Sequence, residues 1–168
     1  MEKEAPSLFR LTYYSTNTLR RTAEPRKSGL RKIIASAKLN NRANGVTGGL
    51  MFNRHYFGQV LEGTRTSVSD LFCKIAQDPR HRSIVIVEAV AVDSLLFDRW
   101  AMGLAEKSAI AEKLNEKYGH QQGYDPTRMN AADFLSYILE MVTLEQNLIS
   151  AAIPMWDEQA APSDFDLV

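Results

Sequence analysis

The sequence is poor in cysteine, since only one of its 168 residues, Cys73, is a cysteine. An internal disulfide and a zinc site built from cysteines are therefore excluded. An excess of positive charge is also missing, because 20 basic residues balance 20 acidic ones, so a general electrostatic attraction for nucleic acid is absent. No apolar run approaches the roughly 18–20 residues of a membrane span, and the polar start lacks the apolar segment of a signal peptide. We therefore expect a soluble, cytoplasmic protein without a membrane or nucleic-acid partner.

The common motifs of catalysis and phosphate binding are missing as well. The chain has no Walker loop and no GxGxxG, GxSxG or HExxH motif. His55 and His120 have no neighbours at metal-ligand spacing, so no metal site is predicted. Because no acid–base pair or nucleophile can be assembled either, the sequence does not indicate an enzyme.

The chain alternates between strand-like and helix-like segments. Helical patterns run from Ser28 to Asn41 and from Thr66 to Asp78. Strands are predicted over residues 8–15, 46–52, 56–62, 84–92 and 100–105. The order β-α-β-β-α-β-β predicts an α+β, ferredoxin-like fold with one added strand, in which two helices pack on one face of a mixed sheet.

Details within these elements give three local expectations. The nearly continuous apolar run over residues 84–92 is typical of a central strand covered on both faces. Asp70 stands three residues after Ser67, which predicts a capping box at the start of the second helix. Cys73, beside Phe72, is expected to pack as a small apolar residue.

The pattern changes after residue 108. A short helix is predicted over 109–118 and a connection over 119–129. Asn130, with Asp133 three residues later, predicts the cap of a longer helix. Its apolar stripe is expected either to cover the open face of the sheet or to form an oligomer contact: Phe134, Tyr137, Ile138, Met141 and Val142. The expected organisation is a domain over 1–108, a two-helix extension over 109–150 and an acidic, poorly ordered tail over 151–168.

Two polar side chains stand among apolar neighbours. Gln59 shares a strand face with Phe57 and Leu61, and Tyr13 shares one with Leu11. A buried amide without partners costs roughly 1–3 kcal/mol. Gln59 therefore either faces solvent, bonds some neighbouring side chain, or pairs with Tyr13 if their strands are adjacent. Taken alone, this pair indicates a satisfied core more readily than chemistry.

The sequence also leaves the roles of two polar pairs at helix ends undecided. Asn40 and Asn41 are ordinary residues for the end of a helix, although their amides could also hold a polar heterocycle. Arg80 and His81 are either exposed or placed to clamp an anion.

Taken in order, these residues resemble the BLUF domain, a blue-light sensor that uses flavin. Five segments within residues 8–107 carry the resemblance: Arg10-Leu-Thr-Tyr-Tyr-Ser15, Asn40-Asn-Arg-Ala-Asn-Gly-Val-Thr-Gly48, Phe57-Gly-Gln-Val-Leu-Glu-Gly63, Gln77-Asp-Pro-Arg-His81 and Phe97-Asp-Arg-Trp-Ala-Met102. The part after residue 108 is similar to the two-helix extension of short, PixD-type members. The resemblance implies a ferredoxin-like sandwich with flavin between its two helices.

The resemblance also implies roles for individual residues. Tyr13 and Gln59 become the photoactive pair, and Trp100 and Met102 become signal relays. The implied flavin-binding residues are Ile33, Asn40, Asn41, Gln59, Lys74, Ile75, Asp78, Arg80 and His81. FAD is the expected cofactor, with FMN and riboflavin left open.

Two positions depart from the family pattern. Gly58 stands where a large apolar residue is common, which should loosen the packing on the strand face away from the flavin. Ala101 replaces a frequent serine between Trp100 and Met102. Neither change touches the residues expected to react.

The implied function is that of a photoreceptor. Light drives an electron and a proton from Tyr13 to flavin, Gln59 rearranges, and a red-shifted state signals through residues 100–105 to the C-terminal helices. The residues after 108 are too few for an enzymatic output domain, so we expect a separate downstream signalling protein and a homo-oligomer. The alternative is a light-independent ferredoxin-like module for a small ligand or RNA, with Tyr14 stacking on bases.

Overall fold

The protein is described by a computed structural model that covers residues 7–19, 41, 43–104 and 109–152. Its described elements, in chain order, are β1 (Leu8–Asn17), β2 (Thr47–Phe52), β3 (Tyr56–Thr64), α2 (Arg65–Ala76), β4 (His81–Val92), β5 (Trp100–Leu104), α3 (Ala109–Lys117), the 3₁₀ turn η1 (Pro126–Arg128) and α4 (Ala131–Ala152). The first predicted helix lies outside the described residues, apart from its end at Asn41 and Ala43, which are helical.

One sheet contains all five strands in the order β4-β1-β3-β2-β5. The first four pair antiparallel, and β5 runs parallel to β2. This is the ferredoxin-like order with one added strand, so the predicted fold class is confirmed.

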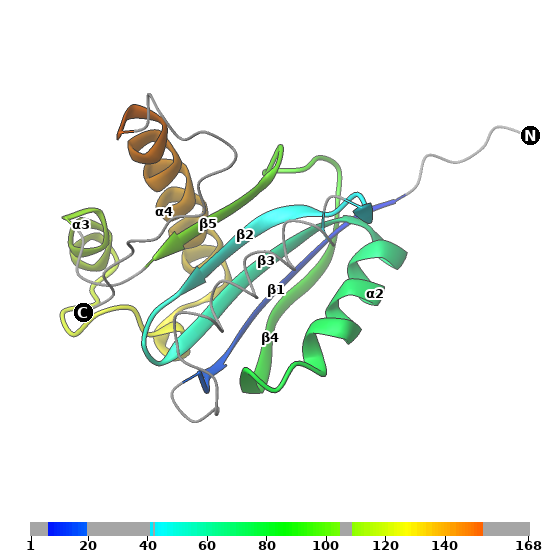
Figure 1. The fold of residues 1–168 in the computed structure, drawn as a ribbon, viewed down its shortest axis with the longest axis horizontal. Coiled ribbons are helices and arrows are strands. Elements are labelled where there is room, and N and C mark those ends of the chain that lie inside the picture. The colour runs from blue at the N-terminus through cyan, green and yellow to red at the C-terminus, as the bar shows by residue number, and fades with distance from the viewer. Residues whose placement is uncertain (1–6, 20–40, 42, 105–108, 153–168) are drawn as a thin grey trace, which may run out of the picture.

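The sheet separates two apolar layers (Figure 1). On one face, α2 places Val68 and Leu71 against Leu11, Tyr13 and Leu61. On the other face, the apolar stripe of α4 packs on Met51 and Val60. The stripe residues are at most 1% exposed, which confirms that α4 covers the face of the sheet opposite α2.

Helix starts follow the sequence in one case and not in the other. Asn130 Oδ1 accepts the Asp133 backbone N–H at 2.8 Å, which confirms the predicted cap of α4. The predicted capping box of α2 was wrong, because Thr64 is the N-cap and its side chain accepts the Ser67 N–H. Cys73, predicted to pack, is exposed.

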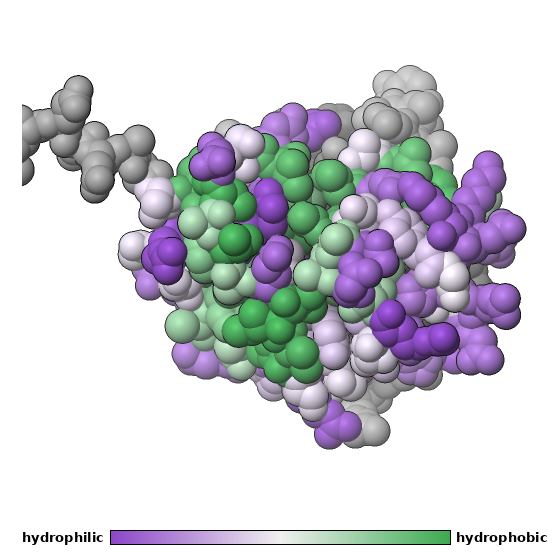
Figure 2. Space-filling model, turned by 180° about the vertical axis from the view of Figure 1, so that it is seen from behind, coloured by the Kyte–Doolittle hydropathy of each residue, from purple (hydrophilic) through white to green (hydrophobic). Residues whose placement is uncertain are grey.

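The prediction of a central strand over residues 84–92 was also wrong. β4 lies at the edge of the sheet, and Val85, Ile86 and Val90 are 42%, 52% and 37% exposed. Figure 2 shows apolar surface gathered on the face away from α2. The apolar run of β4 therefore belongs to an edge strand with exposed apolar side chains, and not to a strand buried on both faces.

A buried ion pair fixes the connection between β4 and β5. Glu62 is fully buried on β3, where the Arg10 Nε donates to its Oε1 at 2.6 Å. Its Oε2 accepts the backbone N–H groups of Leu96 and Phe97, each at 2.9 Å. This carboxylate therefore holds the segment that leads into Trp100 at the start of β5.

The packing at Gly58 is tight, contrary to the prediction that a glycine here loosens it. Tyr124, from the connection between α3 and α4, is 2% exposed, and its hydroxyl lies where a Cβ at position 58 would be. Such a Cβ would also lie 3.3 Å from the Phe134 ring. A distant residue thus fills the space that the glycine leaves.

Candidate functional site

The centre of the site is the pair Tyr13 and Gln59. Antiparallel pairing of β1 and β3 puts the two residues opposite each other, and their side chains are 2% and 4% exposed. The Tyr13 hydroxyl donates a hydrogen bond to Gln59 Oε1. Burial, and secondarily the negative charge of Asp78, raises the pKa of Tyr13. The phenol therefore keeps its proton at neutral pH and acts as the donor in this bond.

Aromatic rings enclose Tyr13 on the α2 side. The Phe72 ring meets it edge-on with centroids 5.3 Å apart, and the His81 ring lies 6.5 Å away. His81 is held at both nitrogens, by Ser15 Oγ at 2.8 Å and by the Ile75 carbonyl at 2.7 Å. Because a carbonyl only accepts, Nε2 carries a proton and donates it to the Ile75 carbonyl.

The end of α2 carries a charged pair. The Arg80 guanidinium forms a two-pronged contact with the Asp78 carboxylate, with Nε 2.8 Å from Oδ1. Burial opposes ionisation of Asp78, but hydrogen bonds from Arg80, together with the charges of Arg80 and His81, outweigh it and lower its pKa. Of the two readings of Arg80, the structure shows a half-buried guanidinium bound to Asp78. Thr18 ties this end to β1, because its N–H donates to the Arg80 carbonyl at 3.0 Å.

Two buried side-chain nitrogens on this side of the sheet lack partners within the described part of the chain. They are Asn41 Nδ2 and Trp100 Nε1. Trp100 packs with Leu50 and Phe57, which belong to the face that Gln59 shares. Buried donors normally find acceptors, so these two nitrogens fit a ligand that offers acceptor atoms. A flavin ring, with its carbonyls and ring nitrogens, has that chemistry.

The other predicted site residues are placed less closely. Ile75 is half-buried against the core around Tyr13, whereas Lys74 is exposed on α2. Ile33 and Asn40 lie outside the described residues. Met102 pairs with Leu50 through the backbone of β5, but its side chain is outside the described set.

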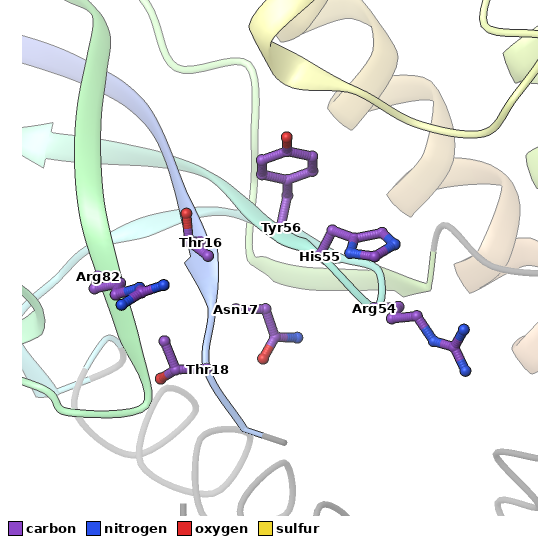
Figure 3. A pocket seen from close by; sticks show the side chains of 7 residues that line it. All are labelled: Thr16, Asn17, Thr18, Arg54, His55, Tyr56 and Arg82. Atoms are coloured by element: carbon purple, nitrogen blue, oxygen red, sulfur yellow. The ribbon is translucent and has the colours of Figure 1, made fainter. Parts of the chain in front are cut away.

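A polar hollow of about 270 Å³ lies at the end of the sheet and includes none of the predicted flavin-binding residues. Figure 3 shows Arg82 directed towards it and Arg54 directed away from the other side chains. Its lining comprises Thr16, Asn17, Thr18, Arg54, His55, Tyr56 and Arg82. The basic groups do not converge on one point, so the hollow is not a second built site.

Sequence reasoning missed Ser15 and Phe72 as neighbours of the photoactive pair, and Glu62 as a buried acid. The alternation of β1 already placed Ser15 on the face of Tyr13, and the helical spacing of Phe72 from Val68 and Leu71 placed it on the packed face of α2. Tyr14, on which the RNA-binding alternative depended, is half-buried and packs beside Phe134 and Tyr56.

The described residues contain neither a cluster of metal ligands nor a membrane-spanning helix. No group of three or more histidine, cysteine or acidic side chains is placed there to hold a metal ion. Within the same part of the chain, no helix has the length and apolar character needed to cross a membrane.

Comparisons with known proteins agree with the geometry. The family model "Sensors of blue-light using FAD" (BLUF) matches residues 8–103. The photoactivated adenylate cyclase subunit beta of Euglena longa is 35% identical over 99 residues, which are 59% of this chain and 11% of that protein. The chain therefore spans about a tenth of that relative.

Solved structures match more of the chain. BlsA in its photo-activated state has a TM-score of 0.68 and 30% identity, covering 79% of this chain and 94% of that one. BlrB in its dark state has a TM-score of 0.64 over 83% of this chain and 98% of that one, and at 24% identity this likeness shows the fold alone. Since the family model covers more than half of its residues, the chain belongs to the BLUF family of blue-light sensors that use FAD.

Proposed function

We propose that this chain is a blue-light photoreceptor whose reacting unit is the buried pair Tyr13 and Gln59. The observation that carries the proposal is their hydrogen bond, formed across β1 and β3 with the rings of Phe72 and His81 beside Tyr13. Membership of the BLUF family supports the same role.

The residues that would hold the cofactor surround this pair. Asn41 Nδ2 and Trp100 Nε1, which have no acceptor among the described residues, would donate to a flavin, while Ile75, Asp78 and His81 would line its α2 side. We assign Arg80, Lys74, Ile33 and Asn40 to the same task from the family resemblance. FAD, when bound, supplies a chromophore for blue light and an acceptor for one electron.

The chain's own contribution is a transfer and a rearrangement. Tyr13 would supply an electron and then its hydroxyl proton to the bound flavin, with Gln59 in the path of the proton, and both would later return to Tyr13. Gln59 would be left rotated or tautomerised, and a stronger hydrogen bond from it to the flavin would produce a red shift. Each such bond is worth about 1 kcal/mol net, so the signal is a shift in population between two nearly equal networks.

The signal would leave through β5. We propose that Trp100 and Met102 relay it into α3 and α4, which directly follow this strand in the chain. In this scheme residues 1–108 are the sensor, 109–150 the extension that delivers output, and 151–168 an acidic tail. We infer that output passes to a separate signalling protein without catalytic turnover.

Self-association is part of the proposal. The exposed apolar side chains of β4, including Val85 and Val90, support a homo-oligomer, because apolar patches of this kind mark contacts between proteins. Sedimentation of the purified chain tests this, and a monomer at all concentrations would count against it.

The central test is an absorption spectrum of the purified, FAD-loaded chain before and after blue illumination. The wild type should show a small red shift that decays in the dark. Tyr13→Phe and Gln59→Leu should retain flavin but show no shift. Tyr14→Phe is the matched control, because Tyr14 packs on the opposite face of the sheet. Removing its hydroxyl should leave the red shift intact. A normal photocycle in Y13F or Q59L would refute the assignment.

A further inference from the structure

The two faces of β3 meet different partners at adjacent residues. On one face Gln59 bonds Tyr13. On the other, Gly58 has no side chain, and the hydroxyl of Tyr124 lies in the space that a Cβ at this position would need. The peptide unit that joins residues 58 and 59 is common to both contacts. A movement of that unit would therefore change the contacts of the photoactive pair and those of Tyr124 at the same time.

Tyr124 is attached firmly to the C-terminal part of the chain. Its ring stacks on Tyr137 of α4, with centroids 5.1 Å apart and planes inclined by 26°. The Tyr137 hydroxyl in turn donates to Asn115 Oδ1 of α3 at 2.7 Å. A displacement of Tyr124 consequently reaches both helices of the extension through contacts between rigid side chains.

The backbone of Tyr124 is held as well. Its backbone carbonyl accepts from Asn53 Nδ2 at 2.9 Å. The Asn53 Oδ1 also accepts the N–H groups of His55 and Tyr56, each at 2.8 Å. The connection that carries Tyr124 is thereby tied to the turn between β2 and β3, which fixes the backbone from which the ring extends over Gly58.

The Tyr124 hydroxyl beside Gly58 lacks a hydrogen bond within the described part of the chain. This hydroxyl is also buried. A buried hydroxyl of this kind is stabilised by any arrangement that brings it to an acceptor. A second arrangement that supplied such an acceptor would therefore be favoured, and two arrangements of similar free energy are what a switch element requires.

We propose that Tyr124, seated on Gly58, is a positioning residue that couples the strand carrying Gln59 to helices α3 and α4. This inference rests on the proposed function, and it adds a route through β3 to the route through β5. The departure from the family pattern at Gly58 is explained by it, since any larger residue would occupy the place of the Tyr124 hydroxyl.

The test compares hydrogen exchange of residues 109–142 in the dark and under blue light, in the full FAD-loaded chain. Tyr124→Phe removes the hydroxyl and keeps the ring stack, whereas Gly58→Ala fills the seat. Tyr118→Phe is the matched control, because its hydroxyl bonds Glu140 within the extension. Circular dichroism and the absorption red shift are recorded for every variant.

We expect the wild type and Y118F to show a light-induced change in exchange over 109–142. Y124F and G58A should keep the red shift. Their light-induced change in exchange should be at least about fivefold smaller than that of the wild type, since fivefold is the lower end of typical coupling between sites. A full exchange response in Y124F would overturn the inference even if G58A failed to fold, and so would a wild type that shifts its spectrum without any change in exchange. A wild type without a red shift would instead remove the proposed function, and this inference with it.

Discussion

The buried carboxylate of Glu62 allows a prediction that can be worked through from the structure. The change is Glu62→Gln, which keeps the shape of the side chain and removes its charge. In the wild type, Oε1 accepts from Arg10 and Oε2 accepts from the N–H groups of Leu96 and Phe97. A glutamine has one acceptor oxygen, and if this oxygen keeps the two backbone bonds, its NH₂ group must face the Arg10 Nε–H, donor against donor.

The expected loss of stability follows from this arrangement. Removing one partner of a buried ion pair costs about 3–5 kcal/mol, because the other charge stays buried without compensation. The Arg10 side chain is 11% exposed, so some water reaches it, and we expect a value near the lower end, about 3 kcal/mol. Combining Glu62→Gln with Arg10→Met removes the stranded charge, and the double variant should lose less than the sum of the two single losses.

Urea unfolding followed by far-ultraviolet circular dichroism, at a constant excess of FAD, measures the effect. Glu116→Gln is the matched control, since this glutamate is exposed on α3 and its change should cost no more than about 0.5 kcal/mol. Equal stability of E62Q and E116Q would refute the reasoning, because it would mean that the carboxylate contributes nothing to holding the β4–β5 connection.

Three further predictions can be checked in the same way. Gly48→Ala should lose at least about 2 kcal/mol of unfolding free energy, since φ is 149° there and the new methyl would overlap a backbone carbonyl of β3. Gly45→Ala is the control, because Gly45 has φ 64° but lies in open space, and it should cost less. Equal losses in the two variants would contradict the overlap. Asp78 has a lowered pKa, so its contribution is present above the ordinary carboxylate pKa and is lost as pH falls through the lowered value. The urea stability gap between wild type and Asp78→Asn should therefore stay constant above about pH 5 and narrow progressively as the pH falls below about 4, and a gap independent of pH would count against the Arg80 contact. Asn41→Ala should weaken FAD binding about 5–10-fold in a fluorescence titration, the loss of roughly one hydrogen bond, and an unchanged Kd would show that its amide does not hold the flavin.

Much of the site followed from local patterns. Alternation put Gln59 on one strand face with Phe57 and Leu61, and Tyr13 on another with Leu11. Their pairing was one of the arrangements left open, and the register of β1 on β3 bears it out. The cap at Asn130 and the buried stripe of α4 were likewise readable, because a capping bond and a helical face depend on residues three or four apart.

Other features depended on contacts between distant segments. An apolar run such as β4 looks the same in the middle of a sheet and at its edge, and only the strand order placed it at the edge. The Thr64 cap replaced the expected one at Ser67 because β3 runs straight into α2 and ends one residue before it.

The strand alternation and the helix stripes were thus contained in the sequence, because each depends on the short repeat of a strand or a helix. The pairing of Tyr13 with Gln59 was one of the arrangements that the sequence left open, and the register of β1 on β3 decided it. Tertiary structure alone decided which side chain fills the space above Gly58. It also decided which basic residue pairs with Glu62. Tyr124 lies 66 positions after Gly58 in the chain, and Arg10 lies 52 before Glu62. No local pattern encodes such a meeting; it follows only when the whole sheet and the helices on its two faces are in place.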